Sequence, residues 1–88
     1  MNSEMQTHLQ YVDLLNEWDP FEIKNGDYDL EIADTIQAIH ELDHPQELAK
    51  RIQGIYEFSF EKLIPLQSCL TIAFKLLEVK NNQSCTIN

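Results

Sequence analysis

Hydrophobic residues recur every three or four positions along most of the chain, the spacing that places them on one side of an α-helix. Stretches containing Pro, Gly, Asp and Asn separate four such segments. Only YEFSF, residues 56–60, alternates aromatic and polar residues with the period of a strand. Because no other segment offers a convincing partner strand, we interpret it as helix. The pattern predicts an all-α fold, a small antiparallel bundle of about four helices.

The first helix is expected to begin at Ser3, because Ser3 and Gln6 have the spacing of a capping box. It should end near Glu17, since Pro20 disfavours helical geometry at the residue before it. Apolar residues recur within it at helical intervals, and we expect them to face the core. They are Met5, Leu9, Val12 and Leu15.

Trp18 and Phe21 bracket the corner that follows, and we expect both to pack against one end of the helices. After the turn signal Asn25 and Gly26, a second helix should start within residues 27–29. Its buried face is predicted to consist of Tyr28, Ile32, Ile36 and Ile39. Acidic residues should occupy the opposite side, namely Asp27, Glu31, Asp34 and Glu41.

Pro45 suits the first turn of a third helix, whose buried face should contain Leu48, Ile52 and Ile55. Gly54 within this helix costs about 1 kcal/mol relative to alanine and is often tolerated for close packing. Tyr56, Phe58 and Phe60 cannot all face the same core, because two positions correspond to about 200° of helical turn. We therefore expect one of the three to mark an interface.

Pro65 opens the last helix, the most regularly amphipathic segment of the chain. Its apolar stripe is Leu66, Cys69, Leu70, Ala73, Phe74 and Leu77. After Val79 the segment KNNQSCTIN has little to bury, so we expect it to fray. The predicted organisation is one helical domain, residues 1–79, and a frayed polar tail, residues 80–88.

A chain of 88 residues supports a single core, and its 43% hydrophobic content is ordinary for a globular protein. No apolar run is long enough for a secretory signal or a membrane span, so we interpret the protein as cytoplasmic. Cys69 and Cys85 fit that compartment, because a small secreted domain would carry a framework of disulfides. Cys69 falls on an apolar stripe and is expected to be a buried small hydrophobe.

Charge is distributed unevenly along the chain. The formal net charge is −9, and residues 1–44 contain 11 acids opposed only by Lys24. Such a half repels phosphate groups, which argues against binding to nucleic acid or to anionic membranes. The acidic surface either serves solubility or steers a basic protein partner towards the molecule.

The sequence HELDH, residues 40–44, matches the HExxH pattern of zinc hydrolases. That chemistry requires both histidines on one face of a continuous helix and a third ligand from downstream. Pro45 displaces His44 from helical geometry, and no histidine follows it. We therefore expect no zinc site here, and a helix end that happens to contain His40 and His44.

The sequence gives little support to other metal sites, and its two isolated glycines cannot form a Gly-rich phosphate loop. Glu41 and His44 have the Glu-x-x-His spacing of di-iron bundles, but those sites need this motif twice. Alignment of Gly26 with the glycine of an EF-hand leaves hydrophobic residues at ligand positions. A weak, irregular calcium site around Asp27, Asp29 and Glu31 is left open. We expect no cofactor and no catalytic centre.

Several segments together resemble a known family. They are NEWDPF, GDYDLEIADTIQAIHELD, RIQGIYEFSFE and IPLQSCLTIA, which span roughly residues 14–77. The combination is similar to the YugE-like family of small bacterial proteins of unknown function. The resemblance implies an all-helical domain of Bacillus-type bacteria and helix at YEFSF, and it implies no catalytic residues.

The function expected from the sequence is protein–protein interaction without catalysis. The partner would be a basic protein, for example a nuclease-like toxin that this protein neutralises, as small acidic immunity proteins do. The candidate partner-binding residues lie in the corner and on the acidic helix face: Trp18, Asp19, Phe21, Asp27, Glu31, Asp34 and Glu41. The alternatives are a structural homo-oligomer, in which Gly54 and the aromatic residues of 56–60 form a symmetric dimer interface, and a metal-dependent hydrolase at residues 40–44.

Overall fold

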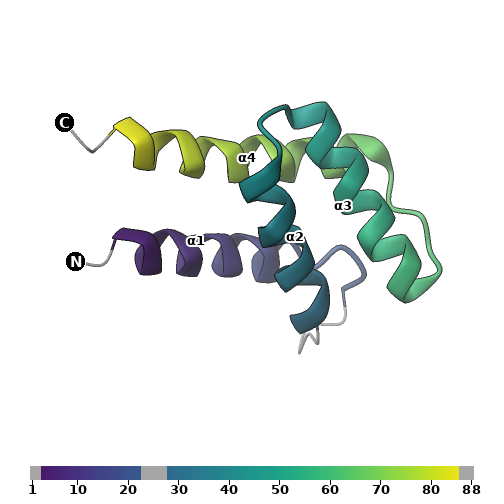
Figure 1. Ribbon diagram of the computed structural model, residues 1–88. Coiled ribbons are helices and arrows are strands. Elements are labelled where there is room, and N and C mark those ends of the chain that lie inside the picture. Colours follow the sequence, from purple (N-terminus) through teal and green to yellow (C-terminus); the bar gives the residue numbers. More distant parts are fainter. Residues whose placement is uncertain (1–2, 23–27, 86–88) are drawn as a thin grey trace.

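The protein folds into four α-helices, and the computed structural model describes residues 3–22 and 28–85 (Figure 1). The helices are α1 Ser3–Trp18, α2 Asp29–Glu41, α3 Pro45–Phe60 and α4 Leu66–Cys85. The predicted all-α fold of about four helices is confirmed, as is helix throughout residues 56–60. Within the described ranges no helix has the length and apolar character needed to cross a membrane.

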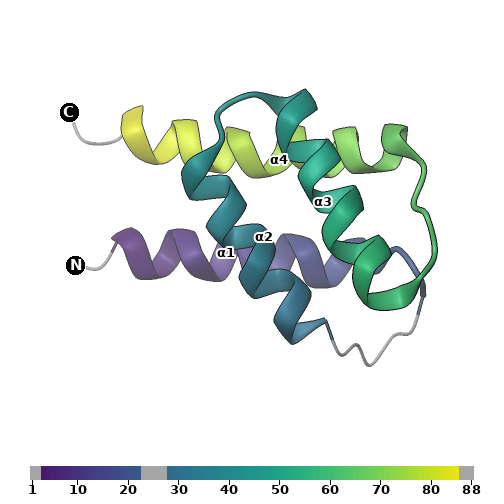
Figure 2. The same ribbon diagram turned by 45° about the vertical axis from the view of Figure 1, so that its right-hand side comes forward.

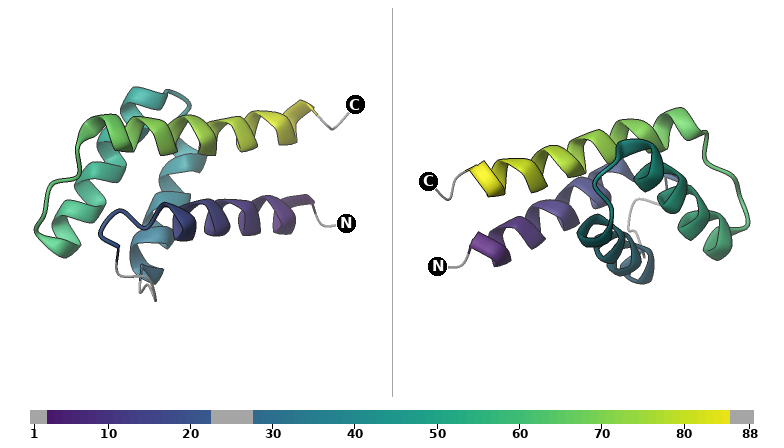
Figure 3. Two further views of the ribbon diagram at one scale, coloured as in Figure 1. Left: turned by 180° about the vertical axis from the view of Figure 1, so that it is seen from behind. Right: turned by 45° about the horizontal axis from the view of Figure 1, so that its top comes forward.

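The helices form two crossed pairs. Helices α1 and α4 run side by side in opposite directions, so the two ends of the chain lie at the same end of the molecule (Figures 1 and 3). Helices α2 and α3 form a second pair that slants across one side of the first pair (Figure 2). Helix α4 packs against all three other helices, whereas α3 packs mainly against α2 and α4. No other element of the described chain covers the outer sides of α2 and α3.

The core lies between these pairs and is almost entirely hydrophobic. Its largest fully buried side chains are Tyr11, Leu15, Tyr28, Ile39, Leu48, Ile52, Tyr56 and Leu76. The predicted buried face of α2 is confirmed, with Tyr28, Ile32, Ile36 and Ile39 all inside. Burial of such side chains contributes most of the free energy that favours folding.

The buried face of α1 differs from the one that the sequence predicted. Leu9 is 54% exposed, and the buried positions are Thr7, Tyr11 and Leu15, which are four residues apart. Of the predicted face, Leu15 is buried and Val12 is partly buried, but Leu9 is exposed; the side chain of Met5 lies outside the described residues. The physical reason is that Tyr11, an aromatic residue with a polar tip, buries its ring, so the side of α1 that carries Tyr11 faces the core.

The corner after α1 turns sharply at Asp19 and is fixed by a tyrosine from the start of α2. Asp19 has a positive φ of 37°, so it leaves the right-handed helical geometry that the following Pro20 disfavours, although it does not take the extended conformation usual before proline. Tyr28 donates a hydrogen bond from its hydroxyl to Asp19 Oδ1 at 2.6 Å, and the same hydroxyl accepts one from the Phe21 backbone N–H at 3.2 Å. Burial and the bond to Asp19 raise the pKa of Tyr28 to about 12.

Five aromatic rings form a continuous cluster, with the fully buried ring of Tyr56 at its centre and four other rings around it. The rings of Trp18, Phe21, Tyr28 and Phe60 lie with their centroids 5.4, 6.5, 5.6 and 6.4 Å from that of Tyr56. Three of these pairs are edge-on or tilted and the pair with Phe60 is stacked, and aromatic pairs of these kinds stabilise beyond the area that they bury. The prediction that Trp18 and Phe21 pack against one end of the helices is therefore confirmed.

The last helix is longer than expected. It continues past Val79 to Cys85, so the segment predicted to fray from residue 80 is helical over most of its length. Lys80 explains part of this extension, because its ammonium group binds the end of α2. Residues 86–88 lie outside the described ranges.

The apolar stripe predicted for α4 is only partly buried. Cys69, Ala73 and Leu77 face the core, as expected, but Leu66 and Phe74 are exposed. These two residues lie at the edge of the predicted stripe, beyond the arc that the other helices cover. The predicted stripe is therefore wider than the contact that α4 makes with the other helices.

Two tyrosine-to-phenylalanine substitutions should separate the two polar environments in the aromatic cluster. Tyr28→Phe removes a hydroxyl with two hydrogen bonds and should lower the free energy of unfolding by about 1–2 kcal/mol. The Tyr56 hydroxyl is buried beside that of Thr35, but the two do not form a hydrogen bond of good geometry. Tyr56→Phe should therefore change stability by less than about 1 kcal/mol or increase it. Urea unfolding followed by circular dichroism measures both, and an equal loss in the two variants would contradict this assignment.

Candidate functional site

The HELDH segment spans the end of one helix and the connection to the next. Helix α2 ends at Glu41, Leu42 is extended, and His44 is extended at φ −104° and ψ 129° immediately before α3. His40 remains in the helix, where it is exposed and lies edge-on to Tyr11 with ring centroids 6.3 Å apart. The predicted helix break before the second histidine is confirmed. The two imidazoles therefore do not share one helix face, which zinc binding through this pattern would require.

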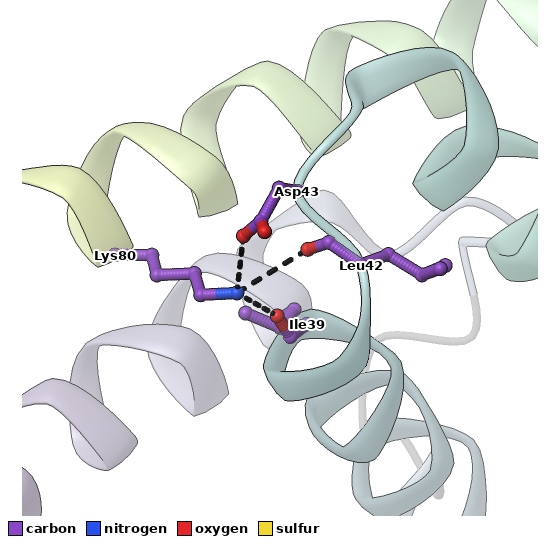
Figure 4. A network of polar contacts seen from close by, with 4 residues as sticks. All are labelled: Ile39, Leu42, Asp43 and Lys80. Carbon is purple, nitrogen blue, oxygen red and sulfur yellow. Dashed lines mark hydrogen bonds and ion pairs between the residues drawn. The ribbon is translucent and has the colours of Figure 1, made fainter.

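The end of α2 is instead occupied by a lysine from α4 (Figure 4). Lys80 Nζ donates hydrogen bonds to the carbonyl oxygens of Ile39 at 2.6 Å and Leu42 at 3.3 Å. It also binds Asp43 Oδ1 at 2.8 Å, and this contact lowers the pKa of Asp43. A cation at the C-terminus of a helix satisfies carbonyl groups that have no partner within the helix and complements the helix dipole. The Lys80 side chain is therefore a structural cap, and its three partners lie 37 to 41 positions before it in the sequence.

Chemistry-bearing side chains are dispersed over the part of the chain that the structure describes. In those residues no three His, Cys, Asp or Glu side chains come close enough to hold a metal ion together. Cys69 is buried and burial raises the pKa of its thiol to about 11, which keeps it protonated and poorly nucleophilic at neutral pH. The calcium ligand set considered above includes Asp27, which lies outside the described residues.

The corner residues proposed for partner binding are engaged within the molecule. Trp18 and Phe21 are half-buried in the aromatic cluster, and Asp19 accepts the hydrogen bond from Tyr28. Their contacts hold the beginning of α2 against α3. The corner therefore positions α2 and offers only the partly exposed edges of its rings to solvent.

The acidic side of α2 is narrower than the sequence indicated. Glu31 was expected on the exposed side but is only 6% exposed, because α2 packs against three other helices and its buried arc extends to this position. The charge of Glu31 lies near the hydroxyls of Tyr28 and Tyr56 and contributes to their raised pKa values. Asp34 and Glu41 are exposed, as predicted, whereas Asp27 lies outside the described residues.

The exposed side of α2 combines acids with an uncovered leucine. Leu30 is 76% exposed and lies between Asp29 and Asp34 along the helix. Neither aspartate has a cationic partner among the described residues. Glu41 is more constrained, since it accepts hydrogen bonds from Gln37 at 3.3 Å and from Arg51 at 3.5 Å. We call the exposed residues Asp29, Leu30, Asp34, Gln37 and Glu41 the acidic α2 face.

The outer side of α3 carries the most exposed aromatic residue in the described part of the chain. Of the three aromatic residues in YEFSF, Tyr56 is buried, Phe60 is half-buried and Phe58 is 89% exposed, so the prediction that they cannot share one core is confirmed. Beside Phe58 an open groove of about 740 Å³ runs between α2 and α3. It is lined mainly by apolar surface of Leu42, Gly54, Ile55 and Phe58, with Asp34, Glu47, Lys50 and Arg51 at its edges.

Sequence comparison assigns the chain to a family. Residues 10–86 match the family described as "Domain of unknown function (DUF1871)". The chain belongs to this family. A protein similar to it is the "Uncharacterized protein YugE" of Bacillus subtilis (strain 168), which is 40% identical over 77 residues that cover 88% of this chain and 90% of that protein. The resemblance to YugE-like proteins inferred from the sequence is thus confirmed.

A solved structure supports the fold. The crystal structure of APC36109 from Bacillus stearothermophilus superposes with a TM-score of 0.84 at 40% sequence identity. The match covers 88% of this chain and 95% of that one. The four-helix arrangement is therefore shared with a protein whose structure was determined experimentally.

The cap at the end of α2 can be tested by removing its charge. Lys80→Met keeps an apolar stem but removes the ammonium group, and it should lower the free energy of unfolding by about 1–3 kcal/mol because the α2 carbonyls lose a charged donor. It should also raise the pKa of Asp43 towards its ordinary value, since the contact with Lys80 is the main reason that this pKa is lowered. Urea unfolding and a carboxyl-detected NMR titration measure the two effects. Lys75→Met, at an exposed lysine of the same helix, is the control and should change neither quantity appreciably.

The glycine in α3 has no packing role within the described chain. Nothing lies within 4 Å of a Cβ atom added at Gly54. Gly54→Ala should therefore raise the free energy of unfolding by about 0.5–1 kcal/mol through helix propensity alone. Thermal or urea unfolding at low protein concentration measures this. The reverse change at an exposed α2 position, Ala33→Gly, should lower stability by a similar amount, and a destabilised Gly54→Ala variant would show that the space is occupied.

Proposed function

We propose that this DUF1871 protein acts by binding another protein, a basic one, and that it is not an enzyme. The observation that carries this proposal is the exposure of Leu30 on the acidic α2 face, where Asp29 and Asp34 have no cationic partner among the described residues. An uncovered apolar side chain surrounded by unpaired charges of one sign is the composition expected of a contact surface for a partner of opposite charge.

The net charge of the chain favours the same class of partner. A formal charge of −9 attracts a basic surface over a distance and raises its association rate, whereas it repels nucleic acid and anionic membranes. Leu30 would then supply the desolvated contact at the centre, with Asp34 and Glu41 pairing with basic side chains around it. A nuclease-like toxin has the required charge, by analogy with small acidic immunity proteins of similar size.

In this proposal the corner residues support the acidic α2 face indirectly, by positioning α2. Trp18, Asp19 and Phe21 fix the beginning of α2 through Tyr28 and the aromatic cluster. We place the interaction in the cytoplasm, because a free buried thiol such as Cys69 is typical of a reducing compartment. The metal-dependent hydrolase alternative gains no support from the geometry, since His44 lies outside α2.

The proposal is tested with a partner captured from extracts of the producing cells at low salt and then measured in purified form. Its affinity should fall about tenfold or more when salt is raised from about 50 to about 300 mM, because exposed charges dominate the contact. Asp34→Lys should weaken binding about tenfold, and Leu30→Ala should weaken it without changing the salt dependence.

Glu78→Lys provides the matched control, because it makes the same change in net charge at an exposed position of α4. It should weaken binding far less than Asp34→Lys does. Affinity that is independent of salt, or equal losses for the two charge reversals, would contradict a binding site on the acidic α2 face.

A further inference from the structure

The outer side of α3 has no partner within the described chain and has the features of a helix-pairing surface. Phe58 stands 89% exposed with an open hollow on each side, and Gly54 lines both hollows. A projecting ring next to an unfilled groove lined by the backbone of a glycine is a complementary pair of shapes on one face. A second copy of the same face could therefore receive the ring of the first.

Gly54 is unexplained by the fold itself. It lies within a regular helix, has no positive φ, and would accept a Cβ without contact. Glycine in such a place destabilises the helix relative to alanine, and its use is to let another backbone approach closely. Since no element of the described chain approaches it, close packing at Gly54 would need a backbone from outside those residues.

One exposed side of α3, continued by the capping residue Glu61, forms two rows of residues whose spacings alternate between three and four, as in a helix that pairs with another helix. Together the rows contain Glu47, Lys50, Arg51, Gly54, Glu57, Phe58 and Glu61. If two copies pair in antiparallel orientation with Gly54 opposite Gly54, Lys50 of one copy faces Glu57 of the other, because both residues lie on the same side of the helix pair. In the same register Arg51 faces Phe58, where its guanidinium group and aliphatic stem can contact the ring. Each contact occurs twice because the arrangement is twofold symmetric.

We propose that a second copy of this chain binds the outer side of α3, forming an antiparallel α3–α3 pair centred on Gly54. Charge complementarity carries this assignment. The basic residues Lys50 and Arg51 precede Gly54 along the exposed side of α3, and the matching residues, the acid Glu57 and the ring of Phe58, follow it. Glu47 and Glu61 work against the pairing, since they face each other at the ends. A single helix pair also buries less than the roughly 800 Å² per partner of a standard interface, so the dimer is weak and reversible.

The first measurement is the mass of the purified wild-type protein as its concentration rises. Sedimentation velocity or light scattering at about 150 mM salt should show an average mass that increases from one 10.3 kDa chain towards two between about 10 µM and about 1 mM. A monomer throughout that range would overturn the proposal. Glu61→Lys replaces each opposing pair of acids by a contact between Glu47 and the introduced lysine, and it should shift the transition to lower concentration.

Charge reversal then tests the register. Lys50→Glu and Glu57→Arg each replace two attractive contacts by two repulsive ones, and each should raise the dissociation constant about tenfold or more. When the two variants are mixed, both contacts of a heterodimer are attractive again, one in the native order and one with its charges exchanged. The mixture should therefore form a heterodimer, visible as a distinct mass by native mass spectrometry. Both variants remain acidic overall, so attraction between whole molecules does not explain such a heterodimer. Self-association that ignores these changes would overturn the α3 pairing.

Matched controls place the same charge changes on another helix. Lys75→Glu and Glu78→Arg, both at exposed positions of α4, should leave the dissociation constant of the dimer within about twofold. Gly54→Ala supplies a readout that stability alone does not move, because it should strengthen the fold while weakening the dimer. These measurements contain no other protein, so their outcome is independent of binding to a basic partner at the acidic α2 face.

Discussion

The packing of aromatic rings around Tyr56 is the constraint on which the rest of the structure depends. Tyr56 comes from α3, yet its ring is covered by Trp18 at the end of α1, Phe21 in the corner and Tyr28 at the beginning of α2. The first half of the chain is thereby held against the second. Because these rings pack within the molecule, the aromatic corner is a structural joint, and the outer sides of α2 and α3 are the surfaces that we propose for binding.

The parts of the fold that depend on local chemistry could be predicted from the sequence. Pro45 and Pro65 mark the beginning of α3 and α4 because a proline ring is accommodated in a first turn or just before it. Pro20 marks the end of α1 for the converse reason. The division of Tyr56, Phe58 and Phe60 between interior and surface followed from helical geometry alone. In each case the deciding forces act between residues only a few positions apart.

The parts that the sequence did not indicate depend on neighbours that are distant along the chain. Glu31 is buried because three helices surround α2, and periodicity says nothing of how many neighbours a helix has. The exposed Leu30 of the candidate site carries no periodic signal either, since it is an isolated leucine between acids. At HELDH a local rule and a distant contact combine: Pro45 places His44 outside α2, and Lys80 then binds the carbonyl groups left at that helix end. Only the antiparallel return of α4 makes this lysine available, so a motif typical of metalloenzymes becomes the anchor of a helix junction.

The two surfaces proposed for binding differ in how charge acts on them. The acidic α2 face presents one sign, so its attraction for a basic partner extends over several ångströms and declines as salt screens it. The α3 stripe presents both signs in a fixed register, and two copies must come together against the repulsion between two strongly acidic molecules. Salt screens that long-range repulsion more than it screens close contacts such as Lys50 with Glu57. If both proposals hold, a single electrostatic character, the excess of acids in residues 1–44, favours basic partners at low salt and self-pairing only as ionic strength rises.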